Sequence, residues 1–170
     1  AQFDPQFTSG QLSEREMWNQ TWNVNVSGTQ VLTSSLVPLL LQSSDPRILF
    51  LTSGLSSLTR TSNLDVPANR SPAKGWPKTG FSATAYRSSK TGLNMLVREW
   101  HRVLKEDGVK VWAIAPGFLA TGLGVGDPEV LKTMGAGDTQ VAGPFVRSVV
   151  EGEWDGEVGR VVSRDGVQEW

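Results

Sequence analysis

The sequence predicts an α/β protein in which a doubly wound parallel sheet carries helices on both faces. Apolar runs that suit buried strands occur at residues 48–51, 109–117 and 158–166. Segments with helical apolar spacing precede and separate these runs, so that helix and strand alternate along the chain. Strands that alternate with helices are joined by right-handed crossovers into a parallel sheet. Because no repeat or low-complexity tract divides the sequence, we expect one domain over residues 1–170 with three strands.

The first helix is expected over residues 13–42, after a loop at residues 1–12. Ser13 and Glu16 form the S-x-x-E pattern of a capping box, in which each side chain satisfies a free backbone N–H of the first turn. Pro38 should kink this helix or mark its end, because proline removes a backbone donor and crowds the preceding turn.

A long polar segment separates the first strand from the second helix. The strand, Ile48 to Leu51, is a continuous apolar run of the kind that is buried on both faces of a parallel sheet. Residues 55–80 are rich in Ser, Pro, Asn and Gly and should form a long surface insertion. A second long helix is expected over residues 83–107. Its apolar stripe comprises Leu93, Leu96, Val97, Trp100, Val103 and Leu104.

The last third of the chain completes the alternation. "VKVWAIAPG", residues 109–117, has the pattern of a second buried strand. Residues 128–135 and 138–151 have helical spacing, and "VGRVVSRDG", residues 158–166, has the pattern of a third strand.

Composition excludes several classes of function. With 16 basic and 17 acidic residues the net charge is −1, whereas proteins that bind nucleic acid through phosphates show a basic excess. The absence of cysteine and the single histidine, His101, argue against a metal site and against a cysteine or Ser-His-acid hydrolase. We see no signal peptide, and the longest apolar run, "LVPLLL", is too short to span a bilayer. We therefore expect a cytoplasmic protein without membrane contact.

Polar residues gather where the predicted strands end, which is where ligands bind in open α/β sheets. Ser53 closes the first strand in "FLTSG", and Tyr86 and Lys90 lie four apart in "YRSSK" at the start of the second helix. "APGFLAT", residues 115–121, follows the second strand directly. Asn25, in "NVNVSG", lies within a helix that its side chain does not favour.

These motifs, in this order, resemble the short-chain dehydrogenase/reductase family over roughly residues 13–167. The resemblance implies a Rossmann-like fold and hydride transfer between NAD or NADP and a small carbonyl or alcohol substrate. A phenol with its ordinary pKa is too weak a base at neutral pH, and a nearby ammonium lowers that pKa. Lys90, one helical turn from Tyr86, can therefore prepare Tyr86 for acid–base work.

The resemblance also assigns the remaining roles. Lys90 would hydrogen-bond the nicotinamide ribose, Ser53 the substrate oxygen, and Asn25 a water that links Lys90 to solvent. The turn after the second strand would lie along the nicotinamide, with Tyr86 and Lys90 completing the cofactor contacts; its residues are Pro116, Gly117, Leu119 and Thr121. The aromatic residues Trp76, Phe81 and Phe118 indicate an apolar substrate. The two long helices, residues 13–42 and 83–106, would form a homodimer or homotetramer interface.

Two departures from the family pattern leave an alternative open. Ser53 and Tyr86 are 33 positions apart, a longer gap than is usual, so Ser56 and Ser57 are further candidates for the serine. No G-x-G-x-x-G loop follows any strand, so the chain corresponds to the catalytic, C-terminal portion of the family. It could instead be an inactive member that acts by binding a partner, or one that needs a complementary N-terminal chain.

Overall fold

A mostly parallel sheet forms the centre of the computed structural model, which describes residues 1–78, 82–123 and 127–170. Its strands are β1 (Arg47–Leu51), β2 (Lys110–Ala115), β3 (Val161–Ser163) and β4 (Gly166–Gln168), and they lie in the order β1-β2-β3-β4. The pairs β1–β2 and β2–β3 are parallel, which confirms the predicted architecture.

The expectation of three strands is wrong by one. The chain reverses after β3, and β4 pairs with it antiparallel through Val161–Gln168 and Val162–Val167. Gly166 makes this reversal possible, because its φ of 116° lies in a region that other residues rarely adopt. The predicted strand at residues 158–166 therefore covers a shorter strand and the turn that follows it.

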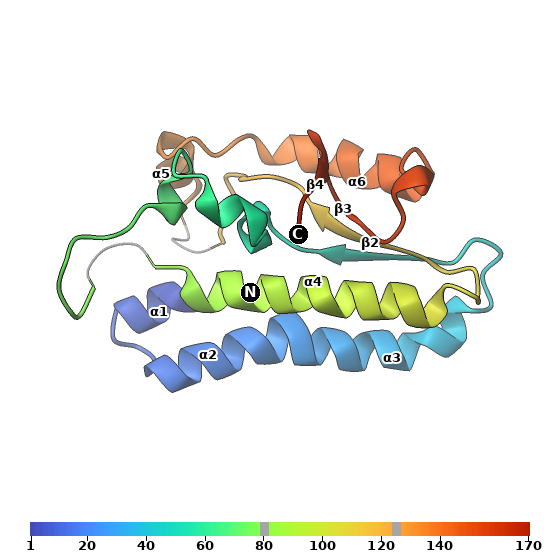
Figure 1. Cartoon of the computed structure of the whole chain (residues 1–170), viewed down its shortest axis with the longest axis horizontal. Helices are drawn as coiled ribbons and strands as arrows, with labels where there is room; N and C mark the ends of the chain where they lie inside the picture. The colour runs from blue at the N-terminus through green and yellow to red at the C-terminus, as the bar shows by residue number, and fades with distance from the viewer. Residues whose placement is uncertain (79–81, 124–126) are drawn as a thin grey trace.

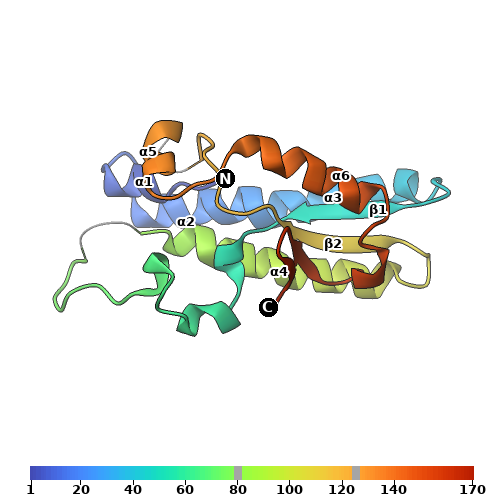
Figure 2. The same ribbon diagram turned by 90° about the horizontal axis from the view of Figure 1, so that it is seen from above.

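Helices cover both faces of the sheet (Figures 1 and 2). On one face lie α4 (Thr84–Leu104) and, beside it, the rod formed by α2 (Glu14–Trp22) and α3 (Thr29–Leu40). On the other face lies α6 (Ala142–Val150). Successive residues of β2 supply both cores, because side chains of a strand alternate between its faces. Val111, Ala113 and Ala115 pack with α4, whereas Trp112 and Ile114 pack with the α6 side chains Phe145 and Val149.

The N-terminal rod is less regular than expected. Residues 1–12 include a short helix, α1 (Asp4–Thr8), with Pro5 in its first turn. The capping box of Ser13 and Glu16 is present at the start of α2. Between α2 and α3 the backbone forms a π-helical turn, Asn23–Gly28. The irregularity therefore lies at Asn25, whereas Pro38 lies inside α3, which ends two residues later.

The remaining segments are short. The predicted insertion contains the 3₁₀ turns Gly54–Ser56, Thr59–Ser62 and Pro67–Asn69. The chain between β2 and α6 contains α5 (Pro128–Thr133) and the turn Thr139–Val141, and the turn Asp155–Glu157 precedes β3. Of the predicted α4 stripe, Leu93, Val97 and Leu104 are buried and Leu96 and Trp100 are partly buried, but Val103 is 52% exposed. No helix within the described ranges is long and apolar enough to cross a membrane.

Candidate active site

Tyr86 and Lys90 lie in the first two turns of α4, beside the carboxyl end of β1. The Lys90 Nζ donates to the backbone carbonyl of Leu51, the last residue of β1, at 2.7 Å. The same Nζ lies 5.9 Å from the centroid of the Tyr86 ring. The Tyr86 side chain is buried, with 7% of its surface exposed. The structure thus brings the two residues of "YRSSK" together at the edge of the sheet where ligands are expected.

The pKa of Tyr86 differs from the sequence expectation. Burial raises the pKa of the Tyr86 phenol, because desolvation disfavours the phenolate, and hydrogen bonding to the Ser53 side chain lowers it only in part. Burial also lowers the pKa of the Lys90 ammonium. Burial, and not the neighbouring Lys90, therefore sets the direction of the Tyr86 pKa shift, and both groups are shifted toward their neutral forms.

Ser53 lies two residues after the end of β1 and has an extended backbone, with φ −152° and ψ 148°. Its hydroxyl oxygen accepts from the Leu55 backbone N–H at 3.2 Å. Because this bond uses a lone pair, the single hydroxyl hydrogen of Ser53 remains available for donation. The alternatives are engaged elsewhere: the Ser56 hydroxyl donates to the Ser53 carbonyl at 2.6 Å, and the Ser57 hydroxyl donates to the Trp170 carbonyl at 3.2 Å. Ser53 is the better placed of the three serines.

Asn25 is buried in the π-helical turn and reaches α4 through Ser89. Its Nδ2 donates to the Ser89 hydroxyl at 2.9 Å and to the Ala1 carbonyl at 2.8 Å, and its Oδ1 accepts from the Ala1 amino group at 2.6 Å. The Ser89 hydroxyl in turn donates to the Tyr86 carbonyl at 2.8 Å. The side chain of Asn25 therefore connects the rod to the Tyr86 turn, and π-helical turns of this kind are frequent at functional sites.

A carboxylate that the sequence patterns did not indicate caps the start of α4. Asp4, 1% exposed, accepts from the backbone N–H groups of Ala85 at 3.1 Å and Tyr86 at 3.3 Å. Ala83, at the N-cap position of α4, offers no side-chain cap. Burial raises the pKa of Asp4, and these backbone hydrogen bonds oppose that rise. The weak local start of α4 was the available signal that a cap must come from elsewhere in the chain.

The turn after β2 lies at the same end of the sheet but forms its own structure. Gly117 has a φ of 109°, and the Ala120 N–H donates to the Gly137 carbonyl at 2.9 Å. The Thr121 hydroxyl accepts from the Leu123 N–H at 3.2 Å. Within the described part of the chain, no hydrogen bond joins the segment Pro116–Thr121 to Ser53, Tyr86 or Lys90.

Two of the three aromatic residues expected around the substrate are exposed. Trp76 and Phe118 are 88% and 54% exposed, and Phe81 lies outside the described residues. The structure therefore adds no support for an apolar substrate.

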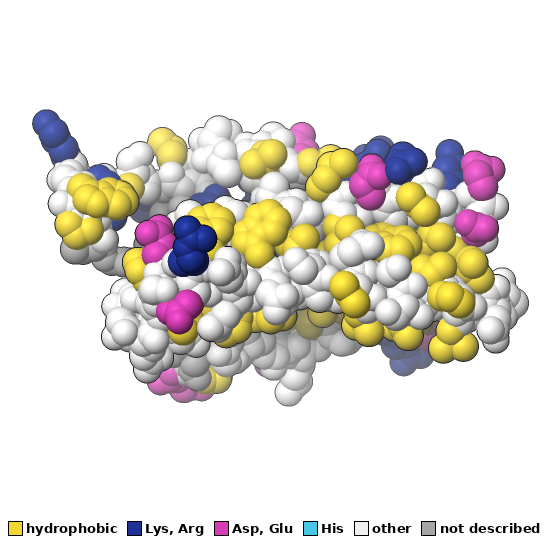
Figure 3. Space-filling model, turned by 90° about the horizontal axis from the view of Figure 1, so that it is seen from below, with side chains coloured by type: hydrophobic (Ala, Val, Ile, Leu, Met, Phe, Trp, Pro, Cys, Tyr) yellow, Lys and Arg dark blue, Asp and Glu magenta, His cyan; other side chains and the backbone are white. Residues whose placement is uncertain are grey.

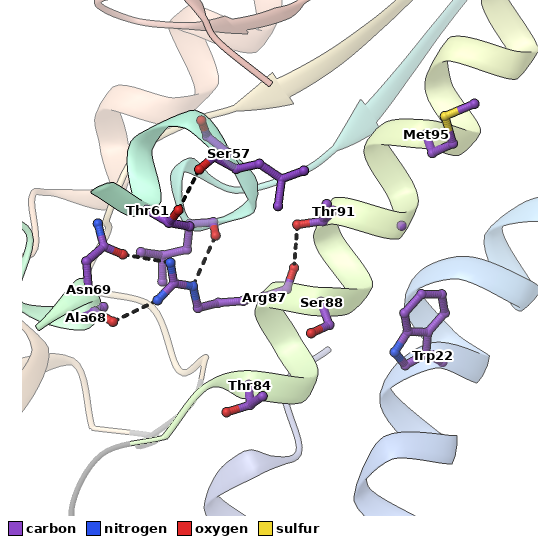
Figure 4. A pocket seen from close by; sticks show the side chains of 13 residues that line it. Trp22, Ser57, Thr61, Ala68, Asn69, Thr84, Arg87, Ser88, Thr91 and Met95 are labelled. Carbon is purple, nitrogen blue, oxygen red and sulfur yellow. Dashed lines mark hydrogen bonds between the residues drawn. The ribbon is translucent and has the colours of Figure 1, made fainter. Parts of the chain in front are cut away.

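An open cavity of about 700 Å³ lies between the insertion, α2 and α4. Figure 4 shows Arg87 at its wall, where the guanidinium donates to the Leu55 and Ala68 carbonyls and to the Asn69 side chain. Ser53, Tyr86 and Lys90 do not line this cavity. Arg87 fixes the insertion to α4, and we place the candidate active site at the sheet edge instead.

Known proteins are similar to this chain in sequence. The family model described as short chain dehydrogenase matches residues 74–129. The short-chain dehydrogenase/reductase tropE of Talaromyces stipitatus is 48% identical over 165 residues, covering 93% of this chain and 60% of that protein. The short-chain dehydrogenase/reductase eupG of a Phoma species is 47% identical, covering 100% of this chain and 64% of that protein. The chain belongs to the short-chain dehydrogenase/reductase family, and it spans less than two thirds of the length of these relatives.

Solved structures support the fold. An NADPH-bound carbonyl reductase from chicken fatty liver superposes with a TM-score of 0.68 at 19% identity, covering 90% of this chain and 57% of that one. The RhlG/NADP active-site complex of Pseudomonas aeruginosa superposes with a TM-score of 0.66 at 22% identity, covering 89% of this chain and 57% of that one. At this identity the likeness shows that the chain has the Rossmann-type fold of these proteins.

Proposed function

We propose that the protein is an NAD(P)-dependent oxidoreductase that interconverts a carbonyl and an alcohol, with Tyr86 as the proton donor and acceptor. The observation that carries this proposal is the arrangement around Tyr86, a buried phenol with the Lys90 ammonium 5.9 Å from its ring centroid and with a pKa that the Ser53 side chain lowers against the effect of burial. A titratable group whose pKa is shifted by burial and by named polar partners is typical of a catalytic site.

The chemistry of the donors fits a nicotinamide nucleotide. The Lys90 ammonium has three N–H groups, and among the described residues Leu51 is its one hydrogen-bond acceptor, which leaves donors for ribose hydroxyls. Pro116, Gly117, Leu119 and Thr121 would contact the nicotinamide end. When bound, the cofactor supplies or accepts the hydride. Two structural neighbours contain NADPH or NADP, and the choice between NAD and NADP stays open for this chain.

The protein's own residues handle the proton. Because burial raises the pKa of Tyr86, the phenol is protonated at neutral pH, which is the state needed to reduce a carbonyl. Ser53 would donate its hydroxyl hydrogen to the substrate oxygen and hold that oxygen beside Tyr86. Lys90 would stabilise the phenolate that remains after proton transfer. Asn25 would support the same helix turn through Ser89 and, as a water ligand, the return of the proton from solvent.

Tyr86→Phe tests the assignment, because it removes one hydroxyl and leaves the ring. We expect the rate of reduction of small carbonyl compounds, measured with NADH and with NADPH, to fall about 10²- to 10⁴-fold. Cofactor binding, followed by nucleotide fluorescence, should change far less than the rate, because Lys90 and the ring at position 86 stay in place. Thr33→Val, a hydroxyl deletion on α3, serves as the control and should keep full activity. A Tyr86→Phe variant that keeps its rate would refute Tyr86 as the acid–base residue.

A second function is proposed beside the first. The protein would act by binding a partner, or would work with a complementary chain that supplies a glycine-rich phosphate loop, since no such loop follows a strand within the given residues. Denaturing intact-mass analysis of the purified protein distinguishes these outcomes. A companion polypeptide that carries such a loop would support a reductase assembled from two chains, whereas a lone chain that binds no nucleotide would favour the binding protein.

We also propose that the protein forms a homodimer or homotetramer through its long helices. Several apolar side chains on this side of the molecule are exposed (Figure 3), among them Val31, Leu32, Leu36 and Leu39 of α3 and Met95 of α4. Large exposed apolar patches mark interaction surfaces. Leu36→Glu should lower the sedimentation coefficient toward that of a monomer, whereas Leu64→Glu, at an exposed leucine of the insertion, should not. A wild-type protein that sediments only as a monomer would contradict this proposal.

A further inference from the structure

Three buried polar side chains that the proposed chemistry does not use lie directly behind Ser53. Thr52 is 6% exposed, Ser56 is 1% exposed and Asn94 is 4% exposed. Thr52 and Ser56 flank the turn that carries Ser53, and Asn94 lies on α4, eight positions after Tyr86. Asn94 interrupts the apolar stripe of the helix between Leu93 and Val97. A buried asparagine in such a stripe needs a set of partners to offset its lost hydration.

The three side chains form one directed chain of hydrogen bonds. The Thr52 hydroxyl donates to the Asn94 Oδ1 at 2.6 Å, and the Asn94 Nδ2 donates to the Ser56 Oγ at 2.9 Å. The Ser56 hydroxyl then donates to the backbone carbonyl of Ser53 at 2.6 Å. Each hydroxyl has a single hydrogen, so this direction uses the hydrogens of both. This series of hydrogen bonds starts at Thr52, the residue before Ser53, and ends on the carbonyl of Ser53 itself.

This geometry couples the serine turn to the helix of Tyr86. The Ser56 N–H also donates to the Ser53 carbonyl at 3.0 Å, and the Thr91 hydroxyl donates to the Ser56 carbonyl at 2.8 Å. Thr91 and Asn94 are both on α4, one turn apart. Two side chains of the catalytic helix thus hold the serine turn at a fixed distance from that helix. Tyr86, on the same helix, is thereby held at a fixed distance from Ser53.

We propose that Asn94 is a positioning residue, which acts through Thr52 and Ser56 to hold the turn that carries Ser53 in place beside the helix that carries Tyr86. The inference rests on the proposed function in taking Ser53 and Tyr86 as the groups that meet the substrate oxygen. Asn94 itself touches neither the substrate nor the cofactor in this scheme.

Tyr86 supplies a direct readout of this positioning. Hydrogen bonding to Ser53 lowers the pKa of the buried phenol, so displacement of Ser53 would leave burial to act alone and would raise the pKa further. Tyr86 is the single tyrosine of the sequence. The ultraviolet difference absorbance of tyrosinate therefore titrates this residue alone, without any need for turnover. The charged neighbours of Tyr86, Lys90 near its ring and Asp4 at its backbone N–H, are the same in every variant below.

Two variants break the chain at different points. Asn94→Leu keeps the volume of the side chain and removes its amide. Ser56→Ala removes the hydroxyl that accepts from Asn94 and donates to the Ser53 carbonyl, and leaves the Ser56 backbone N–H in place. In both we expect the tyrosinate titration to move to higher pH. We also expect kcat for carbonyl reduction to fall about 10-fold or more, because small displacements of reacting groups cost rate steeply. The Kd of the nicotinamide nucleotide should stay the same.

A conservative pair provides rescue and control. Thr52→Val deletes the first donor of the chain and should shift the titration in the same direction, whereas Thr52→Ser keeps the donor and should restore the wild-type curve. Thr33→Val makes the same chemical change on α3, where the hydroxyl donates only to the Thr29 carbonyl, and should leave the titration and kcat unchanged. Ser56→Ala is the mildest change and gives the answer if Asn94→Leu does not fold.

Folded Asn94→Leu and Ser56→Ala proteins with the wild-type titration and kcat would overturn the inference. Failure of the proposed function is a separate result. If Tyr86→Phe kept its activity, the assigned reaction would be wrong, but the tyrosinate titration would still report whether this hydrogen-bond chain holds the turn that carries Ser53 in place beside the helix that carries Tyr86.

Discussion

The charged side chains at the two ends of the parallel sheet have different partners: carboxylates at the amino end and a backbone carbonyl at the carboxyl end. At the amino end, Arg47 begins β1 and Lys110 begins β2, and each binds two carboxylates. Arg47 contacts Asp155 at 2.6 Å and Asp45 at 2.7 Å, and Lys110 contacts the same pair at 2.6 Å and 2.9 Å. At the carboxyl end, Lys90 has a backbone carbonyl as its partner, at 2.7 Å.

The pKa shifts follow from this difference. At the amino end, hydrogen bonds from Arg47 and Lys110 lower the pKa of Asp155 to about 2, and bonding to Asp155 raises the pKa of Lys110. At the carboxyl end, burial raises the pKa of Tyr86 and lowers that of Lys90. Ion pairing thus stabilises the ionised forms of Asp155 and Lys110 at the amino end. Desolvation at the carboxyl end favours the neutral forms of Tyr86 and Lys90. Only the second arrangement suits groups that must exchange a proton.

The largest expected effect is a difference in reaction rate between two lysine-to-methionine variants, one at each end of the sheet. Lys90→Met removes the ammonium beside Tyr86 and should reduce the rate of carbonyl reduction about 10²-fold or more. Lys110→Met should leave that rate unchanged and lower only the thermal unfolding midpoint, because Asp155 and Asp45 keep Arg47 as a partner. Steady-state rates and thermal scans of the two variants measure both effects. Equal rates in the two variants would contradict a catalytic role for Lys90.

A smaller effect separates two carboxylates by the sign of their pH dependence. The folded-state pKa of Asp155 is about 2, below its ordinary value of 3.8, so its stabilisation is present above pH 3.8 and is lost as the pH falls toward 2. After allowance for solvent screening of a side chain that is 34% exposed, Asp155→Asn should cost about 1 kcal/mol near neutral pH. The difference in unfolding free energy between the wild type and Asp155→Asn should become smaller as the pH falls.

Asp4, at the start of α4, should show the opposite slope. Its folded-state pKa is raised above 3.8, so its contribution to stability is greatest below that pH and is lost as the pH rises through the folded value. Asp4→Asn should therefore gain stability relative to the wild type as the pH rises. Urea unfolding of both variants from about pH 3 to about pH 7 measures the two slopes. Slopes of the same sign would contradict the contrast between the two ends.

Sequence patterns predicted the regular elements because those depend on neighbouring residues. The capping box of Ser13 and Glu16, the apolar spacing of α4 and the buried run of β2 are each contained in a few consecutive positions. The short elements were missed for the converse reason. Strand β4 exists because it pairs with β3, and α1 places Asp4 against a helix that begins 80 positions later in the chain.

The sequence by itself determined the alternation of helices and strands and brought Tyr86 and Lys90 to one face of a helix, because residues four apart are neighbours there. Tertiary structure alone decided the environment of these groups. Burial of Tyr86 depends on residues that are distant in sequence. The Asp4 cap of α4 and the hydrogen bonds from Thr52 through Asn94 to Ser56 also join distant residues. The pKa of a buried group depends on everything packed around it, so the raised pKa of Tyr86 was not readable from "YRSSK".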